Sequence, residues 1–216
     1  GTEPEFLPRT QGFDHYYGLK SGASNHFCPG GPGRPGEPTP AYKGDGTRSY
    51  AFDDQLINGY TPEDPDYYTT DAFTDYSIGF IEKAEQENDP QPWFLYLSYT
   101  APHDPLHAWP EDIANYEDIY DEGYEAIASA RYERQLSSGL IDETFPRSPS
   151  DTKKDWDQLT EAKKQDQLRR MMVYAAMVDR VDQNIGRLVT RLEELGELDN
   201  TLIMFCSDNG ACPFDR

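Results

Sequence analysis

One apolar stripe near the end of the chain constrains the fold more than any other feature. Apolar side chains recur at helical spacing from 174 to 195 and Gly196 follows them, which predicts a long amphipathic helix ending at that glycine. A short loop leads to the apolar run Leu202 to Phe205, which is typical of a buried strand. Such a helix–strand unit predicts an α/β fold with a mostly parallel sheet flanked by helices. The stripe consists of Tyr174, Met177, Val181, Ile185, Leu188, Leu192 and Leu195.

A second helix-and-strand unit lies in the middle of the chain. Aromatic and aliphatic residues recur at helical spacing from 73 to 84, and a capping residue is available within 69–71. The Asn-Asp-Pro sequence at 88–90 predicts the end of this helix. The apolar run 93–99 then reads as a strand. Because both strands follow helices through short turns, we expect them to be parallel.

The remaining segments carry weaker patterns. Residues 110–116 predict one or two helical turns, and residues 124–136 predict a helix that ends at Gly139. Residues 1–60 are rich in Gly, Pro and Tyr, so we expect mainly loops there, with a short strand or turn within 13–19.

The charge balance narrows the classes of partner. The chain has 40 Asp and Glu against 19 Lys and Arg, a formal net charge of −21. Nucleic acids and anionic membrane surfaces bind clustered cationic side chains, so neither is expected as a partner. No stretch is apolar over enough residues to span a bilayer. The chain starts without Met and ends soon after a predicted strand, so we expect an internal part of a larger domain.

The cysteines and two of the histidines give no site of their own. Cys28, Cys206 and Cys212 lack zinc-binding spacing. Cys206 falls in the last predicted strand and is expected to be a buried apolar residue, whereas Cys28 and Cys212 could pair with each other or remain free. Lone histidines in loops are more often surface residues than ligands, so His15 and His26 are left outside the site.

Polar side chains follow both predicted strands at the point where each strand ends. Asp208 and Asn209 come after the strand 202–205, and a loop containing His103 comes after the strand 93–99. Ligands of open α/β sheets bind outside the carboxyl ends of the strands, so the two segments are expected to form two walls of one site. A carboxylate beside an amide oxygen suits Ca²⁺ or Mg²⁺, although a plain Asx turn explains the same two residues.

Four motifs, in order along nearly the whole chain, resemble the sulfatase family. They are Gly-Phe-Asp-His-Tyr-Tyr-Gly at 12–18, Tyr-Thr-Ala-Pro-His-Asp-Pro-Leu at 99–106, Tyr-Ala-Ala-Met-Val-Asp at 174–179 and Ser-Asp-Asn-Gly at 207–210. The resemblance is to arylsulfatase-type members of the alkaline phosphatase superfamily. It implies an alkaline-phosphatase-like sheet and a sulfuric ester hydrolase, with residues 1–216 as the central portion of one catalytic domain.

The resemblance also assigns roles to individual residues. It makes Asp208 and Asn209 ligands of a divalent cation, usually Ca²⁺, and makes His103 the catalytic histidine near the sulfate and the leaving oxygen. His107 is at most a rim residue, and Asp104 has no assigned role. The family's nucleophile, a formylglycine made from a Cys/Ser-x-Pro-x-Arg motif, is expected outside this fragment, because the chain contains no such motif. These 216 residues alone are therefore expected to hydrolyse nothing.

Two other functions remain open beside sulfate ester hydrolysis. One is a phosphoesterase or phosphonate hydrolase of the same superfamily, with a different nucleophile. The other is a non-catalytic carbohydrate-binding scaffold, although such a protein would not need to keep His103, Asp208 and Asn209 together. The substrate implied by the resemblance is a small-molecule or glycan sulfate ester. The implied location is periplasmic or extracellular.

Overall fold

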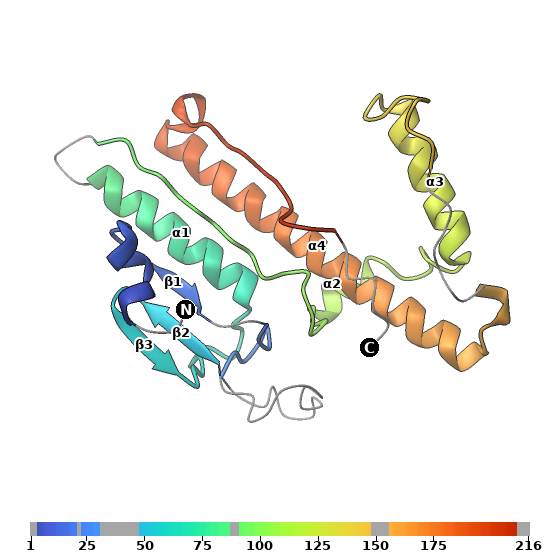
Figure 1. The fold of residues 1–216 in the computed structure, drawn as a ribbon, viewed down its shortest axis with the longest axis horizontal. Coiled ribbons are helices and arrows are strands. Elements are labelled where there is room, and N and C mark those ends of the chain that lie inside the picture. Colours follow the sequence, from blue (N-terminus) through green and yellow to red (C-terminus); the bar gives the residue numbers. More distant parts are fainter. Residues whose placement is uncertain (1–3, 21–22, 31–47, 87–90, 148–155, 211–216) are drawn as a thin grey trace.

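The computed structural model describes residues 4–20, 23–30, 48–86, 91–147 and 156–210. Within these residues the chain forms a small sheet and four α-helices joined by loops and short 3₁₀ helices (Figure 1). The strands are β1 (Tyr17–Leu19), β2 (Ser49–Phe52) and β3 (Gln55–Asn58), and the α-helices are α1 (Thr69–Gln86), α2 (Pro110–Ala114), α3 (Gly123–Ser137) and α4 (Glu161–Leu195). The 3₁₀ helices are η1 (Pro4–Phe6), η2 (Pro8–Gln11), η3 (Trp156–Gln158) and η4 (Leu198–Asn200).

The long helix α4 is the element against which α1 and α2 pack. It ends at Gly196, as predicted, where the backbone takes a φ of 77°. It begins at Glu161, earlier than the apolar stripe indicated, because the Thr160 hydroxyl accepts a hydrogen bond from the Lys163 N–H and the polar residues that follow are good helix formers. Its middle packs against α2 in a core of Ile113, Val173, Ala176 and Met177.

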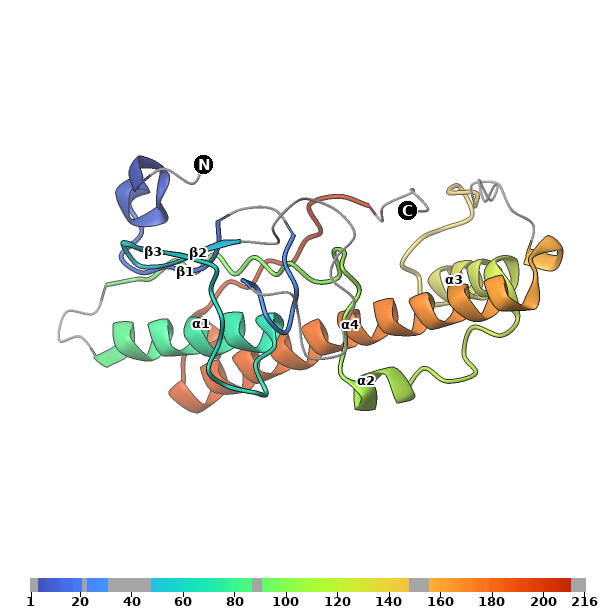
Figure 2. The ribbon, with the colours of Figure 1, turned by 90° about the horizontal axis from the view of Figure 1, so that it is seen from below.

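Helix α1 lies beside α4 and carries the small sheet on its other side (Figure 2). The sheet has the order β1-β2-β3 and is antiparallel throughout. Tyr17 of β1 stacks on Tyr76 of α1 with ring centroids 3.6 Å apart. The strand or turn expected within 13–19 is therefore confirmed as β1. The β2–β3 hairpin was missed, since its tight turn uses Asp53 at a φ of 49° in place of the usual glycine.

Two extended segments cross the helix layer without joining a sheet. Residues 93–99 and 202–206 run in the same direction in both views (Figures 1 and 2), but neither forms a strand ladder among the described residues. Phe94 and Tyr96 are 76% and 72% exposed, and Leu202 is 85% exposed. The prediction of a buried strand at 202–205 is thus wrong for this structure, because no described element covers its outer face. Cys206 is likewise exposed rather than buried.

The structure confirms an α/β fold but does not show the mostly parallel sheet that the sequence predicts. The sheet that the described residues contain is antiparallel, so the parallel sheet stays a prediction. Helix α3 confirms the helix expected at 124–136, and α2 confirms the short one before it. The capping prediction for α1 is wrong in detail, because Asp71 binds side chains of α4 instead. None of the described helices combines the length and apolar character needed to cross a membrane.

Candidate functional site

The loop of residues 100–107 begins where the first extended segment ends. A turn closes it, with the His103 N–H donating to the Thr100 carbonyl at 2.9 Å. The Ala101-Pro102 and Asp104-Pro105 peptide bonds are both cis. The His103 side chain is exposed, and its Nδ1 lies 2.7 Å from the Asp104 carbonyl oxygen. Because a carbonyl oxygen only accepts, this contact requires a hydrogen on Nδ1 and leaves Nε2 as the ring nitrogen available to another partner.

Asp208 and Asn209 lie at the corresponding end of the second extended segment. Both are exposed, and the Ser207 hydroxyl donates to the Asn209 carbonyl at 2.6 Å, which closes the turn. Their side-chain oxygens are hard donors of the kind that Ca²⁺ prefers, but Ca²⁺ takes six to eight ligands. No group of three or more His, Cys, Asp or Glu in the described residues is arranged to hold a metal ion. The pair fits part of a coordination shell.

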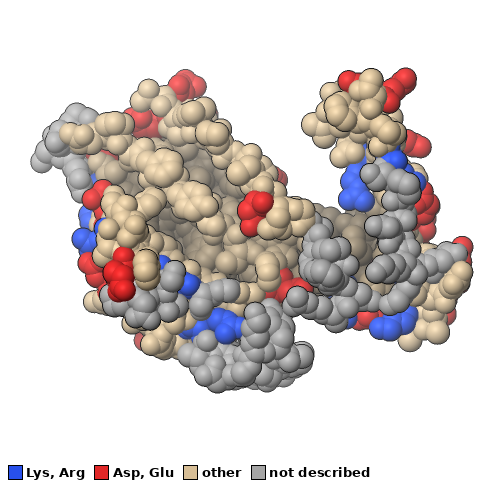
Figure 3. Space-filling model, viewed as in Figure 1, with Lys and Arg blue, Asp and Glu red and all other residues tan. Residues whose placement is uncertain are grey.

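The predicted site residues share one region of the molecule. Figures 1 and 2 both place the loop 100–107 and the turn 207–210 beyond the same ends of the two extended segments, near the middle of α4. Figure 3 shows the face of the molecule seen in Figure 1, on which many of the charged side chains lie around the edge. That the loop and the turn form two walls of one site stays a prediction.

His26 is a part of this region that sequence reasoning assigned to the surface. The residue is 1% exposed, and its Nε2 lies 3.2 Å from the carbonyl oxygen of His103. Burial lowers its pKa to about 4; the hydrogen bond to the His103 backbone raises the pKa against this, and the charges of His107 and His103 lower it further. The prediction of a surface histidine is wrong because burial here depends on contacts with α1 and with the loop 100–107. The uncharged Ser24-Asn25-His26-Phe27 sequence was the available signal.

His107, which the sequence allowed at most at the rim of the site, contacts residues 26, 27 and 68 in the structure. It is partly buried, and its Nδ1 accepts the backbone N–H of His26 at 3.5 Å. Its carbonyl accepts a hydrogen bond from the Tyr68 hydroxyl at 2.9 Å, and its ring lies 5.9 Å from that of Phe27. Asp104 approaches the His103 ring through its backbone carbonyl. His107 thus holds the end of the loop on residues 26 and 68.

A charged cluster behind the site joins three helices. Arg180 of α4 donates from Nε and Nη2 to the two carboxylate oxygens of Asp71, at 2.8 and 2.7 Å. Asn184 donates to the same carboxylate at 2.7 Å. Arg180 also lies 3.6 Å from the Asp112 carboxylate of α2, a group whose pKa is raised mainly by burial. This cluster fixes α1 and α2 on α4.

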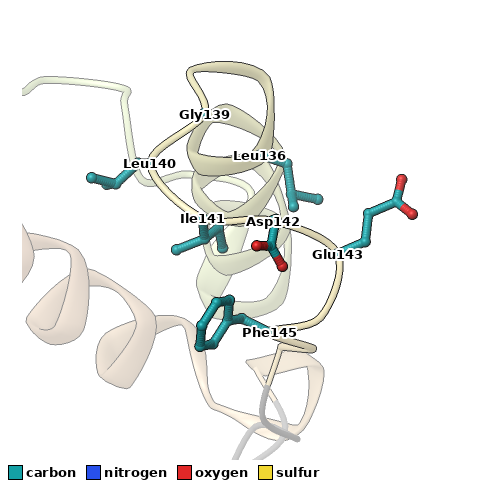
Figure 4. A pocket seen from close by; sticks show the side chains of 7 residues that line it. All are labelled: Leu136, Gly139, Leu140, Ile141, Asp142, Glu143 and Phe145. Carbon is teal, nitrogen blue, oxygen red and sulfur yellow. The ribbon is translucent and has the colours of Figure 1, made fainter.

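A pocket of about 400 Å³ lies elsewhere, at the end of α3 (Figure 4). Hydrogen bonds from Thr144 lower the pKa of Asp142, one of its wall residues, so this carboxylate stays ionised. None of the predicted site residues lines the pocket. Its lining residues are Leu136, Gly139, Leu140, Ile141, Asp142, Glu143 and Phe145.

The cysteines add nothing to the site. Cys28 is of intermediate exposure and forms no disulfide with another described residue. Cys212 lies outside the described residues, so a pairing with Cys28 stays a hypothesis.

Comparison with known proteins gives consistent matches. A family model described as Sulfatase matches residues 6–214. An uncharacterized sulfatase of Schizosaccharomyces pombe is 35% identical over 221 residues, which cover 98% of this chain and 37% of that protein. An arylsulfatase of Klebsiella aerogenes is 32% identical over 213 residues, which cover 99% of this chain and 43% of the relative. The chain thus spans less than half the length of these relatives.

Solved structures give weaker matches. The crystal structure of Ps i-CgsB in complex with k-i-k-neocarrahexaose has a TM-score of 0.48 at 26% identity, over 92% of this chain and 32% of that one. The structure of BT4656 in complex with D-glucosamine-2-N,6-O-disulfate has a TM-score of 0.45 at 21% identity, over 88% of this chain and 42% of that one.

Proposed function

This chain belongs to the sulfatase family, and from that membership we propose that the protein is a sulfuric ester hydrolase that uses His103, Asp208 and Asn209. The observation that carries the proposal is the family match over residues 6–214, which includes all three residues. The chain is then the central portion of one catalytic domain, and its two extended segments belong to a mostly parallel sheet of the alkaline-phosphatase type. The nucleophile segment lies in another part of the protein.

His103 is the proton donor of the proposed reaction. Its Nδ1–H is bound to the Asp104 carbonyl, so Nε2 faces the substrate. When Nε2 carries a proton, it donates that proton to the alcohol oxygen as the sulfur–oxygen bond breaks, which avoids the release of an alkoxide. The turn at 100–103 holds the imidazole at the exposed edge of the loop.

Asp208 and Asn209 are the metal ligands of the proposal. Their exposed side-chain oxygens would hold Ca²⁺ together with ligands from other parts of the protein. When bound, the ion supplies positive charge beside the sulfate oxygens, which a chain with a formal net charge of −21 otherwise lacks. The nucleophile is a formylglycine outside these residues, since no Cys or Ser in the chain stands two residues before a proline.

The substrate class is a small-molecule or glycan sulfate ester. The relative from Klebsiella aerogenes is named an arylsulfatase, and a relative from Bacteroides thetaiotaomicron is named an N-acetylglucosamine-6-O-sulfatase. The location is periplasmic or extracellular, with support from a Drosophila melanogaster relative named an extracellular sulfatase. The acidic surface argues against nucleic acid as a partner.

The test is turnover of 4-nitrophenyl sulfate by the protein expressed over its whole open reading frame. We expect calcium-dependent turnover that EDTA abolishes, and none from these 216 residues alone. His103→Ala should lower kcat roughly 10²- to 10⁴-fold, the usual contribution of a general acid. Asp208→Ala should lower turnover roughly a hundredfold and weaken calcium binding. Asp199→Ala, at an exposed carboxylate in η4, is the matched control and should keep full activity.

The other outcomes separate the competing functions. If the protein hydrolyses a phosphate diester or a phosphonate faster than a sulfate ester, it is a phosphoesterase or phosphonate hydrolase. Binding of a sulfated glycan without turnover would indicate a non-catalytic scaffold. Sulfate ester turnover that persists in EDTA and in Asp208→Ala would refute the role of Asp208 as a metal ligand. Robust turnover by the 216 residues alone would refute the proposal that the nucleophile lies outside them.

A further inference from the structure

His26 joins the start of α1 to the loop that carries His103. It is 1% exposed, and its carbonyl accepts hydrogen bonds from the Thr69 N–H at 2.8 Å and from the Thr69 hydroxyl at 2.9 Å. Its ring stacks on Tyr68 with centroids 5.8 Å apart. On its other side, the Asn25 side chain accepts the Phe27 N–H at 2.8 Å and fixes the turn around it. The position of His26 is therefore set from both sides.

The imidazole of His26 contacts the backbone of His103 and not its ring. Its Nε2 lies 3.2 Å from the His103 carbonyl oxygen. A carbonyl only accepts, so Nε2 must carry the hydrogen and donate it. Nδ1 is buried and has no hydrogen-bond partner among the described residues. The contacts thus specify one neutral tautomer, with the hydrogen on Nε2.

The surroundings of His26 keep the ring neutral. A second proton, on Nδ1, would create a buried cation with an unpaired N–H. Burial is the main reason that the pKa of His26 is lowered to about 4; it outweighs the hydrogen bond to the His103 backbone, which raises the pKa, and the two titratable neighbours His107 and His103 lower the pKa further. The tautomer that holds the His103 carbonyl therefore persists across the neutral and mildly acidic range.

We propose that His26 is a positioning residue, which holds the main chain of His103 so that the His103 imidazole faces the sulfate ester. The carbonyl of His103 is bound by His26, and the Nδ1 of its ring is bound by the next carbonyl along the chain. These two contacts fix the backbone of His103 and one nitrogen of its ring, which leaves Nε2 as the ring nitrogen available to the substrate. His26 also donates its own N–H to His107, so the loop is held at two points. The inference rests on the proposed function.

Two substitutions separate the hydrogen bond from the volume of the ring. His26→Leu fills much of the buried space but cannot donate, whereas the amide of His26→Gln can replace Nε2–H as a donor. In the whole protein we expect His26→Leu to lower kcat roughly ten- to a hundredfold with KM changed less than about twofold, since it displaces the proton donor. His26→Gln should restore kcat to within about threefold of the unsubstituted protein.

His15 supplies the matched control. It is the other histidine that the sequence placed outside the site, and its ring contacts Lys83 at 2.8 Å and Asp53 at 3.4 Å instead of the loop of His103. His15→Leu should leave kcat unchanged. Equal kcat for His26→Leu and the unsubstituted protein, or an equal loss in His26→Gln and His26→Leu with both variants folded, would overturn the inference.

A second measurement does not depend on turnover or on the folding of a variant. Long-range ¹H–¹⁵N correlation spectra of the whole protein report the tautomer of each imidazole. We expect His26 to show the Nε2–H tautomer and to remain neutral at pH 5.5. A Nδ1–H tautomer, or a ring that titrates near pH 6.5, would overturn the inference even if sulfatase activity is present. If no sulfate ester is hydrolysed but this tautomer is found, the proposed function fails while the contact of His26 with the His103 carbonyl stands.

Discussion

Removing the Asp71 carboxylate should destabilise the protein far more than removing any exposed carboxylate of the same helix. Asp71 lies on α1 and accepts three hydrogen bonds from α4, two from Arg180 and one from Asn184. Its side chain is 17% exposed, and Asn184 is buried. Asp71→Ala therefore leaves a partly buried guanidinium and a buried amide without their acceptor.

The expected loss follows from these three contacts. A net contribution of about 1.5 kcal/mol for each of the three hydrogen bonds to a charged group gives roughly 4.5 kcal/mol, and breaking a fully buried ion pair costs about 3–5 kcal/mol. Arg180 is 27% exposed and keeps its contact with Asp112, so water and that carboxylate recover part of the loss. We expect a decrease of about 3 kcal/mol in the free energy of unfolding.

Asp75 provides the control on the same two helices. It pairs with Arg187 of α4, but the two side chains are 58% and 47% exposed, so this ion pair is worth less than about 1 kcal/mol. Urea unfolding followed by circular dichroism at a fixed pH gives both values. A double-mutant cycle with Arg180→Ala should show a coupling energy of about 2 kcal/mol with Asp71.

Equal losses for Asp71→Ala and Asp75→Ala would refute the reasoning. Such a result would mean that Arg180 and Asn184 find other partners or water at no cost, and that burial does not decide the strength of these contacts. An uncoupled double-mutant cycle would lead to the same conclusion.

Two further predictions concern the region around the site. Burial lowers the pKa of His26 to about 4 from its ordinary 6.5. Between pH 6.5 and pH 4, His26 is therefore protonated in the unfolded chain and neutral in the folded chain. Because of His26, the free energy of unfolding should fall by about 3 kcal/mol between pH 6.5 and pH 4 and should not fall further below pH 4. Urea unfolding measured over this pH range should show the decrease in the unsubstituted protein and not in His26→Leu. An added Cβ at Gly30 would overlap the backbone of Gly59 and Tyr60, so Gly30→Ala should cost about 1–3 kcal/mol. Gly79→Ala, in α1 with open space around it, should instead gain up to about 1 kcal/mol in the same unfolding measurement, and an equal effect of both would contradict the packing argument.

The helices could be predicted because their pattern is local. The stripe from Tyr174 to Leu195 and the glycine after it correctly indicate most of α4. The earlier part of α4 was missed because it has no continuous apolar face, and its start depends on Thr160. The local sequence pattern therefore predicts a helix best where an apolar face of that helix packs against the rest of the protein.

The hidden parts of the site depend on tertiary contacts. His26 has no charged neighbour and no periodic pattern, and its burial comes from Tyr68, Thr69 and the loop of His103. The resemblance to a family predicts roles for His103, Asp208 and Asn209 but does not predict what holds them in place. Residues that act through a backbone carbonyl leave no motif, because many side chains can make such a contact.

The two extended segments show why strands are harder to predict than helices. In 93–99, Trp93, Leu95 and Leu97 are partly buried toward the helices, while Phe94 and Tyr96 face outward and are largely exposed. The alternation identifies two faces, but the hydrogen-bond partners of a strand come from distant residues. Burying one such aromatic side chain under another layer would add roughly 1.5–3 kcal/mol to the free energy of unfolding. This face therefore stabilises the fold only when a further layer packs on it. In the proposed enzyme, a layer that buried this face would also fix the ends of the segments, so stability and assembly of the active site would depend on the same packing.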